Sequence, residues 1–291
     1  MRLDPTRTTA IRKAFYLDMR RRFAQLKVSI LKLILEEDAF GLKKSVSPLA
    51  NQRFKYLDDD KKIKAFMEWL DKEIGRTLLE VKGDKGWEAQ YIDRAYLTAA
   101  KRVFADLKRG EHPKKIEGAF EHFMRGGFLS RPQLVSNARR VKLTSKNQPR
   151  NARGQFVKMR MLETKTREQM KGMTARMKQG IGRILTEELS RQTTAKAIAK
   201  RLAAELDLSK RQAAKLVQTE IVATYAESQL DAMEALDIGE VGAEVEFETT
   251  SGNPCPQCID LEGQVFSIEE ARGVIPVHPN CQCRWNPIIN T

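Results

Sequence analysis

Residues 11–34 read IRKAFYLDMRRRFAQLKVSILKLI, and the spacing of their apolar side chains indicates the fold class. The apolar residues recur at steps of three and four, which places them on one face of a helix. They are Ile11, Phe15, Met19, Phe23, Leu26, Ile30, Leu33 and Ile34. Arginine and lysine residues occupy the other sides, so the stretch predicts a long, basic amphipathic helix.

The same period predicts helices through most of the remaining chain. The expected ranges are about 59–78, 87–110 and 113–124, followed by a helix that starts near residue 159. In that last helix several methionines lie in the apolar stripe, where methionine serves as adaptable packing. Thr193 and Ser209 are candidate N-cap residues, so we expect two further helices, over about 194–206 and 210–236.

After Gly239 the period changes to two, because Val245 and Phe247 alternate with glutamates. This alternation predicts a half-buried strand with an acidic outer face. We therefore expect a mostly α protein with a C-terminal α+β domain, that is, an elongated helical N-terminal part and a small, cysteine-rich, strand-containing C-terminal end. The expected domains are a basic helical domain over 1–130, a basic polar arm or linker over 131–160, and a C-terminal domain over 161–291 whose long helices end at about 238.

The charge is divided unevenly along the chain. The net charge is +14, but residues 219–291 contain 13 acidic residues against Arg272 and Arg284, a balance of −11 that leaves +25 on residues 1–218. Such a division indicates a basic part that meets an anionic partner, although solvated basic helix faces would give the same count.

The segment 131–160 carries nine basic residues and no acidic one. With few apolar residues it cannot form a core of its own, so we expect an extended arm that contacts DNA phosphates or an acidic protein surface, or a solvated linker between domains. The candidate binding residues are Arg131, Arg139, Arg140, Lys142, Lys146, Arg150, Arg153, Lys158 and Arg160.

The longest apolar run, over residues 28–35, contains Lys32 and is much shorter than the roughly 20 residues that a membrane span requires. The first residues lead into a charged helix rather than a signal-peptide cleavage site. We therefore expect a protein that is made in a cytoplasm and does not associate with a membrane there.

All four cysteines lie near the C-terminus, as Cys255-Pro-Gln-Cys258 and Cys281-Gln-Cys283, with His278 three positions before Cys281. Two such knuckles can complete the tetrahedron that Zn²⁺ requires. The five candidate ligands of a structural zinc are Cys255, Cys258, His278, Cys281 and Cys283, with His278 or Cys283 as the fourth ligand. Reduced cysteines packed without a metal and disulfides are the alternatives, the latter disfavoured in a cytoplasm.

The order of these motifs resembles that of the phage Mu F-like family of minor head, or head morphogenesis, proteins. The matching elements are Thr219-Glu220 on a long helix, a strand, the Cys255–Cys258 knuckle followed by Leu261-Glu-Gly-Gln-Val-Phe266, and finally Pro276-Val-His-Pro-Asn-Cys-Gln-Cys283. The resemblance covers about residues 180–286. It identifies the expected 161–291 domain as Mu F-like.

The resemblance implies a non-enzymatic bacteriophage protein located in the virion head. It implies binding to the portal vertex or to neighbouring head proteins, nonspecific contact with packaged DNA, and a role in head assembly or genome delivery. The family's C-terminal domain has also been likened to ADP-ribosyltransferase toxins, which makes a transferase with Glu220 as its catalytic residue one alternative.

A zinc-containing DNA-binding regulator is the other alternative, because the two helices expected around Ser209 have the arrangement of a helix-turn-helix. The second of these helices becomes acidic at Glu220, Glu227 and Asp231, which would repel the phosphates that flank a major groove. Nonspecific binding is therefore the stronger expectation.

Overall fold

The computed structural model describes residues 6–42, 59–83, 85–107, 150–235, 244–249 and 254–288. The chain forms two compact units, each built from separate segments. The first unit contains Met1–Arg12, Ala89–Lys165 and Gln218–Thr291, and the second contains Lys13–Glu88 and Thr166–Val217. Each unit is described separately below.

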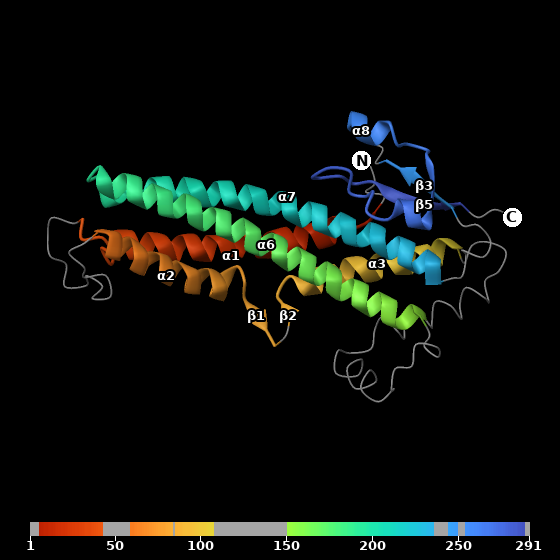
Figure 1. Cartoon of the computed structure of the whole chain (residues 1–291), viewed down its shortest axis with the longest axis horizontal. Coiled ribbons are helices and arrows are strands. Elements are labelled where there is room, and N and C mark those ends of the chain that lie inside the picture. Colours follow the sequence, from red (N-terminus) through yellow and green to blue (C-terminus); the bar gives the residue numbers. More distant parts are fainter. Residues whose placement is uncertain are drawn as a thin grey trace. The chain divides into compact units, whose positions relative to one another are not determined.

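The second unit is a bundle of helices (Figure 1). It holds most of α1 (Thr9–Leu35), α2 (Asp59–Thr77), the later part of α6 (Arg150–Ser190) and the first part of α7 (Ala195–Ala235). The apolar stripe expected on α1 is buried, and so are Met170, Met173 and Met177 of α6. The expectation that these methionines serve as packing is therefore confirmed.

A short hairpin follows α2, and two arginines of the bundle, Arg22 and Arg167, hold the residues on either side of it. The hairpin consists of β1 (Val81–Lys82) and β2 (Lys85–Gly86), which pair antiparallel. The guanidinium of Arg22 donates to the backbone oxygen of Thr77 at 2.6 Å and lies 4.1 Å from the centre of the Trp87 ring. Arg167 donates to Glu88 and to the backbone oxygen of Leu79, both at 2.8 Å. The hairpin was not expected from the sequence.

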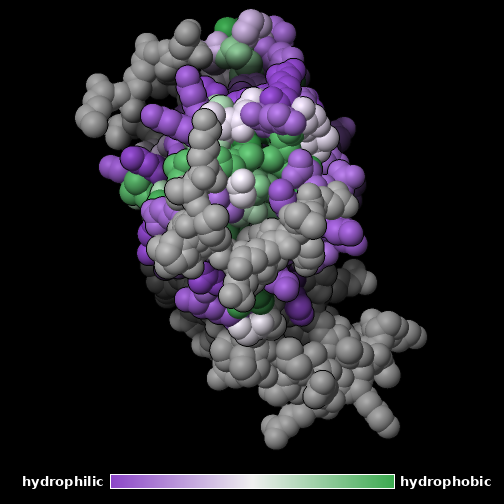
Figure 2. All heavy atoms as spheres, turned by 90° about the vertical axis from the view of Figure 1, so that its left-hand side faces the viewer, coloured by the Kyte–Doolittle hydropathy of each residue, from purple (hydrophilic) through white to green (hydrophobic). Residues whose placement is uncertain are grey.

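At the end of the bundle where α6 turns into α7, hydrophilic side chains surround a smaller group of apolar ones (Figure 2). Arg201 of α7 donates to Glu187 at 2.9 Å and also pairs with Glu188, which in turn accepts from Thr193 at 2.8 Å. This hydrogen bonding lowers the pKa of Glu188, with Arg201 as the largest cause. The turn is therefore held by a small ionic network.

Two expected helix boundaries are wrong. The structure has one continuous helix, α7, in place of the two expected over about 194–206 and 210–236, and Ser209 is buried inside it. The apolar stripe continues through Leu206, Ala213 and Val217 without a glycine or proline to interrupt it, so the capping signal of Ser209 is overridden.

The helix expected from about residue 159 begins nine residues earlier, because α6 starts at Arg150. Residues 150–160 of the expected arm are therefore helical. Extending an existing helix adds one hydrogen bond for each residue that is fixed, and no proline lies between Arg150 and Ser190. The helix expected over 113–124 and the rest of the arm, 131–149, lie outside the described residues.

The first unit packs a small sheet against helices. It includes α3 (Ala89–Leu107), the last part of α7, α8 (Pro256–Ile259), α9 (Ile268–Ala271), and the strands β3 (Glu244–Glu248), β4 (Val265–Ser267) and β5 (Arg284–Ile288). The sheet order is β4-β3-β5, with both pairs antiparallel. The expected strand is confirmed in β3, where Val245 and Phe247 are buried and the glutamates face outward.

Two polar clamps join α7 to this C-terminal end. Gln229 donates to the backbone oxygen of Trp285 at 2.9 Å and accepts from its backbone N–H at 3.2 Å. Arg272 lies 3.0 Å from Asp231, 3.1 Å from Glu227 and 2.5 Å from Glu234. Asp231 also accepts from the Tyr96 hydroxyl at 2.7 Å, and burial together with this carboxylate raises the pKa of Tyr96.

The fold class is therefore confirmed as mostly α with a C-terminal α+β end. Among the described residues, no helix combines the length and the apolar content that a membrane crossing requires. The division into domains at 130 and 160 remains a prediction.

We predict that Arg272→Met lowers the free energy of unfolding by about 2–3 kcal/mol, because it leaves the Asp231 carboxylate buried without its cation. Chemical denaturation measures the change. Arg183→Met is the matched control, since the Arg183 side chain is 71% exposed and 4.0 Å from Glu187, and should cost less than about 0.5 kcal/mol. Equal losses in the two variants would contradict this account of the Arg272 clamp.

Candidate functional site: a cysteine and histidine cluster

The first knuckle is formed by α8, a single helical turn. Cys255 precedes this turn with an extended backbone, and Pro256 begins it. The backbone N–H groups of Cys258 and Ile259 both donate to the Cys255 oxygen at 3.0 Å. This tight turn brings the Cys255 and Cys258 thiols to the same side.

The second knuckle comes from the loop that leads into β5. The N–H of Cys281 donates to the His278 oxygen at 3.0 Å, which closes a turn in which Asn280 has a φ of 68°. The N–H of Asn280 donates to the Thr219 hydroxyl at 3.3 Å, so this turn is also attached to α7. Cys281 and Cys283 then lie directly before β5.

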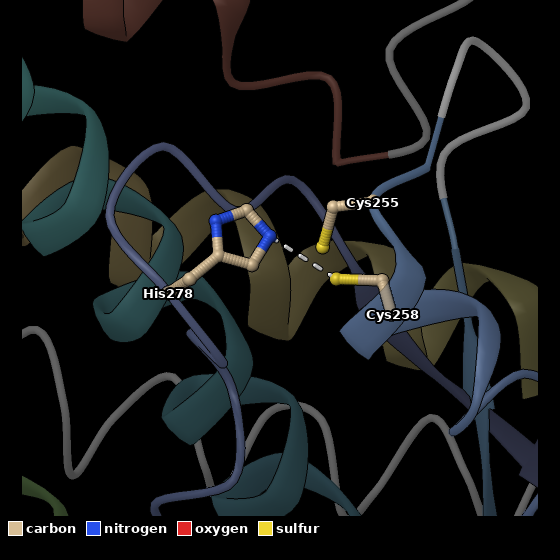
Figure 3. A group of neighbouring side chains, drawn as sticks. All are labelled: Cys255, Cys258 and His278. Atoms are coloured by element: carbon tan, nitrogen blue, oxygen red, sulfur yellow. Dashed lines mark hydrogen bonds between the residues drawn. The ribbon is translucent and has the colours of Figure 1, made fainter.

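The five candidate ligands form two groups that share one thiol. Cys255, Cys258 and His278 make one group, and Cys258, Cys281 and Cys283 make the other, with all ligand atoms in each group within 4.8 Å of one another. The Cys258 sulfur lies 3.2 Å from Nε2 of His278, and the Cys255 and Cys258 thiols turn toward the imidazole (Figure 3). Cys258 is thus central to the cluster.

The donor set fits a metal ion of the size and preference of zinc. Ligands at about 2.3 Å from a tetrahedral Zn²⁺ lie roughly 4 Å apart, which is within the spacing of both groups. Nδ1 of His278 donates to the backbone oxygen of Pro279 at 2.8 Å, so its proton is held there and Nε2 presents a lone pair toward Cys258. The cluster can therefore hold a metal ion.

The cluster is largely closed to solvent. Cys258, Cys281 and Cys283 are each 2% exposed or less, while Cys255 and His278 are partly exposed. A catalytic zinc keeps an open coordination position, whereas a structural zinc takes all four ligands from the protein. The four thiols are free of disulfides. This burial favours a structural role.

The thiols influence one another electrostatically. Hydrogen bonding from Cys283 lowers the pKa of Cys281 to about 5, whereas burial raises the pKa of Cys258 to about 12. The pKa of Cys283 is also raised, because its thiol donates to Cys281 and is buried. One thiolate is therefore favoured in a network of buried thiols.

The Thr219-Glu220 pair lies beside this cluster on α7. Thr219 holds the Asn280 turn, as described above, and Glu220 is 6% exposed with Nζ of Lys165 3.9 Å from its carboxylate. Glu220 is thus a largely buried carboxylate with a lysine nearby.

The candidate DNA-binding residues are described only in part. Arg150, Arg153 and Lys158 lie on the first turns of α6, although the placement of their side chains is outside the described residues, and Arg160 is exposed on the same helix. The remaining candidates, Arg131, Arg139, Arg140, Lys142 and Lys146, also lie outside the described residues.

The contacts that join the C-terminal end to α7 were not identified from the sequence, and they are made by Gln229, Asp231, Arg272 and Asn280. One signal was present, because Arg272 and Arg284 are the two basic residues in an acidic stretch of 73 residues. Both form ion pairs, Arg272 with Asp231 and Arg284 with Glu248. An isolated arginine in an acidic segment was thus a marker of a structural ion pair.

Comparison with known proteins supports the motif assignment. Residues 179–286 match the family described as Phage Mu protein F like protein. No curated protein and no solved structure matches the chain. The matched region contains the last part of α6, all of α7, strands β3 and β4, the first residues of β5, and the cysteine and histidine cluster. The resemblance drawn from the motifs is therefore confirmed over residues 179–286, which are similar to the Phage Mu protein F like family.

Proposed function

We propose that the chain is a minor component of a phage head that binds the portal vertex or neighbouring head proteins and contacts packaged DNA without sequence preference. The observation that carries the proposal is the family match over residues 179–286, which supports a head-related protein and a location in the virion. The proposed role is a binding role without enzymatic activity, and the structural and morphogenetic character of the family is consistent with such a role. Head assembly and genome delivery are the steps in which it would act.

The charge of the second unit supports the DNA contact. Its described residues include 25 basic and 16 acidic side chains, a net charge of +9. A positive surface gains affinity for DNA by releasing the counterions that surround the phosphates, and this gain does not depend on base sequence.

Crosslinking of assembling heads tests the attachment to head proteins. An affinity-tagged chain should carry crosslinks to the portal or to adjacent head proteins after purification under denaturing conditions. A tagged host protein expressed at the same level is the control. Crosslinks that match this control in kind and number would refute the attachment.

We predict that the protein binds DNA duplexes of unrelated sequence with equal affinity. This affinity should fall about tenfold or more between low and physiological salt concentration. Filter binding on two duplexes of different sequence measures it. A strong preference for one sequence would support the regulator instead, and absence of binding at low salt would show that the charge serves a protein partner.

The basic residues at the start of α6 and before it are the expected DNA contacts. We predict that glutamine in place of Arg139, Arg140, Lys142, Arg150 and Arg153 leaves the unfolding temperature unchanged and weakens DNA binding, because the segment contributes few apolar contacts. The matched control neutralises five exposed residues elsewhere, Arg20, Lys72, Arg176, Lys200 and Arg211. Equal losses in both variants would show that only total charge matters.

We also propose that the cluster holds a structural zinc. The metal would be held by Cys255, Cys258 and Cys281 with His278 or Cys283, and it would link the α8 knuckle to the loop before β5. The support is the closed, sulfur-rich donor set and the small size of the sheet around it.

We predict that the purified, reduced protein contains one zinc per chain and that Cys258→Ser releases it, because Cys258 belongs to both ligand groups. Limited proteolysis should then cleave the region after Glu244, while the second unit stays resistant. His278→Ala and Cys283→Ser form a matched pair, and the variant that retains zinc identifies the residue that is not a ligand. Absence of metal from carefully prepared, reduced protein would refute the zinc proposal.

A further inference from the structure

A cleft of about 700 Å³ lies within the second unit, far in sequence from the cysteine cluster. One wall is α1 from Arg21 to Ser29, and the other is the end of α2 together with the start of the hairpin. Figure 1 shows these elements side by side. At 1.5 Å per residue, the α1 wall is about 12 Å long, which is enough for a short peptide segment.

The rim of the cleft is positive and accessible. The side chains of Arg21, Arg76 and Lys82 are 67%, 74% and 78% exposed. Each lies near a carboxylate of its own unit, with Arg76 2.7 Å from Glu73 and Arg21 2.7 Å from Asp18. Each of these two pairs uses one edge of a guanidinium, and Lys82 lies 3.9 Å from Glu80, so all three exposed cations keep donors for an incoming carboxylate.

The floor of the cleft adds a fourth cation. Arg22 is 7% exposed and donates from Nη1 to Thr77 and Glu80. Its buried Nε forms no hydrogen bond with any described residue, although Asp18 lies 3.6 Å away. The four cations and the two carboxylates of Glu73 and Glu80 give the lining a net charge of +2, and Asp18, which pairs with Arg21 and Arg22, lowers the local balance to +1. The cleft is thus complementary to an acidic ligand.

The lining also contains an apolar side chain that is open to solvent. Val28 is 65% exposed on the α1 wall, next to Ala24 and Gln25. An apolar side chain contributes nothing to a phosphate contact, but it can pack against an apolar side chain of a protein segment. Arginine beside exposed apolar side chains is the composition of protein interfaces.

We infer that this cleft binds an acidic segment of a partner protein, with its carboxylates on Arg21, Arg76 and Lys82 and an apolar side chain against Val28. The inference rests on the proposed function for the existence of a protein partner, and it adds the surface and the chemistry of the segment that this surface recognises. DNA would then be bound by other basic surfaces of the chain.

The test uses the full-length protein and fluorescence anisotropy. The probes are a short labelled peptide of Glu and Leu, the same peptide with Lys in place of Glu, and a labelled duplex of unrelated sequence. The Glu-containing peptide should bind and the Lys-containing peptide should not. The variant Arg21→Gln/Arg76→Gln should weaken peptide binding about fivefold or more, while the control Arg20→Gln/Lys72→Gln, with the same change in net charge, should weaken it less than about twofold.

A second pair of variants tests the apolar contact. Val28→Ser should weaken binding of the Glu and Leu peptide and leave duplex binding unchanged, whereas Leu208→Ser, at a 43% exposed position outside the cleft, should change neither. Circular dichroism melts confirm that each variant folds.

Three results would overturn the inference. They are equal effects of the two charge variants, loss of duplex rather than peptide affinity in Arg21→Gln/Arg76→Gln, and absence of peptide binding by the unaltered protein at low salt. These probes contain no head protein, so failure here leaves the crosslinking test of the proposed function unaffected.

Discussion

The C-terminal end depends on its attachment to α7. Its sheet has three strands of five, three and five residues, which is too little surface to form an independent core. Trp285 provides much of that core, packing edge-on against Phe247 and Phe266 with ring centres 5.7 and 5.5 Å away. Gln229 satisfies both backbone groups of the same tryptophan. One side chain of α7 therefore fixes the strand that carries the core aromatic residue.

The other contacts act around this clamp. Arg272 holds the loop after α9 to three carboxylates of α7, and Thr219 holds the turn between His278 and Cys281. The cysteine and histidine cluster then joins the two loops that these contacts position. In the zinc proposal, the metal would link the two knuckles and so supply part of the folding free energy of this small, loop-rich end.

The spacing of apolar residues predicted those helices and strands that are determined by residues close together in the sequence. The α1 stripe, the methionine stripe of α6 and the alternation in β3 depend on side chains a few residues apart, and all three were predicted correctly. The break expected at Ser209 failed because a capping residue is a weak signal when the apolar stripe continues past it. The β1–β2 hairpin has two-residue strands, too short for any period to be detected.

In the candidate site, too, the sequence predicted the local features but not the contacts between distant residues. Cysteine spacing predicted that two knuckles would meet, but the sharing of Cys258 between two ligand groups depends on how the loops fold. Likewise, the pairing of Arg272 with Asp231 spans 41 residues, and the clamp of Gln229 on Trp285 spans 56. Such contacts are set by tertiary packing, and no periodic pattern in a single sequence indicates which distant residues will meet.

Quantitative mass spectrometry of purified virions and immature heads tests most directly the proposal that this chain is a minor head protein. We expect the chain to be present in the particles at a small fraction of the abundance of the major capsid protein. Absence from both virions and immature heads, or an abundance equal to that of the major capsid protein, would contradict it.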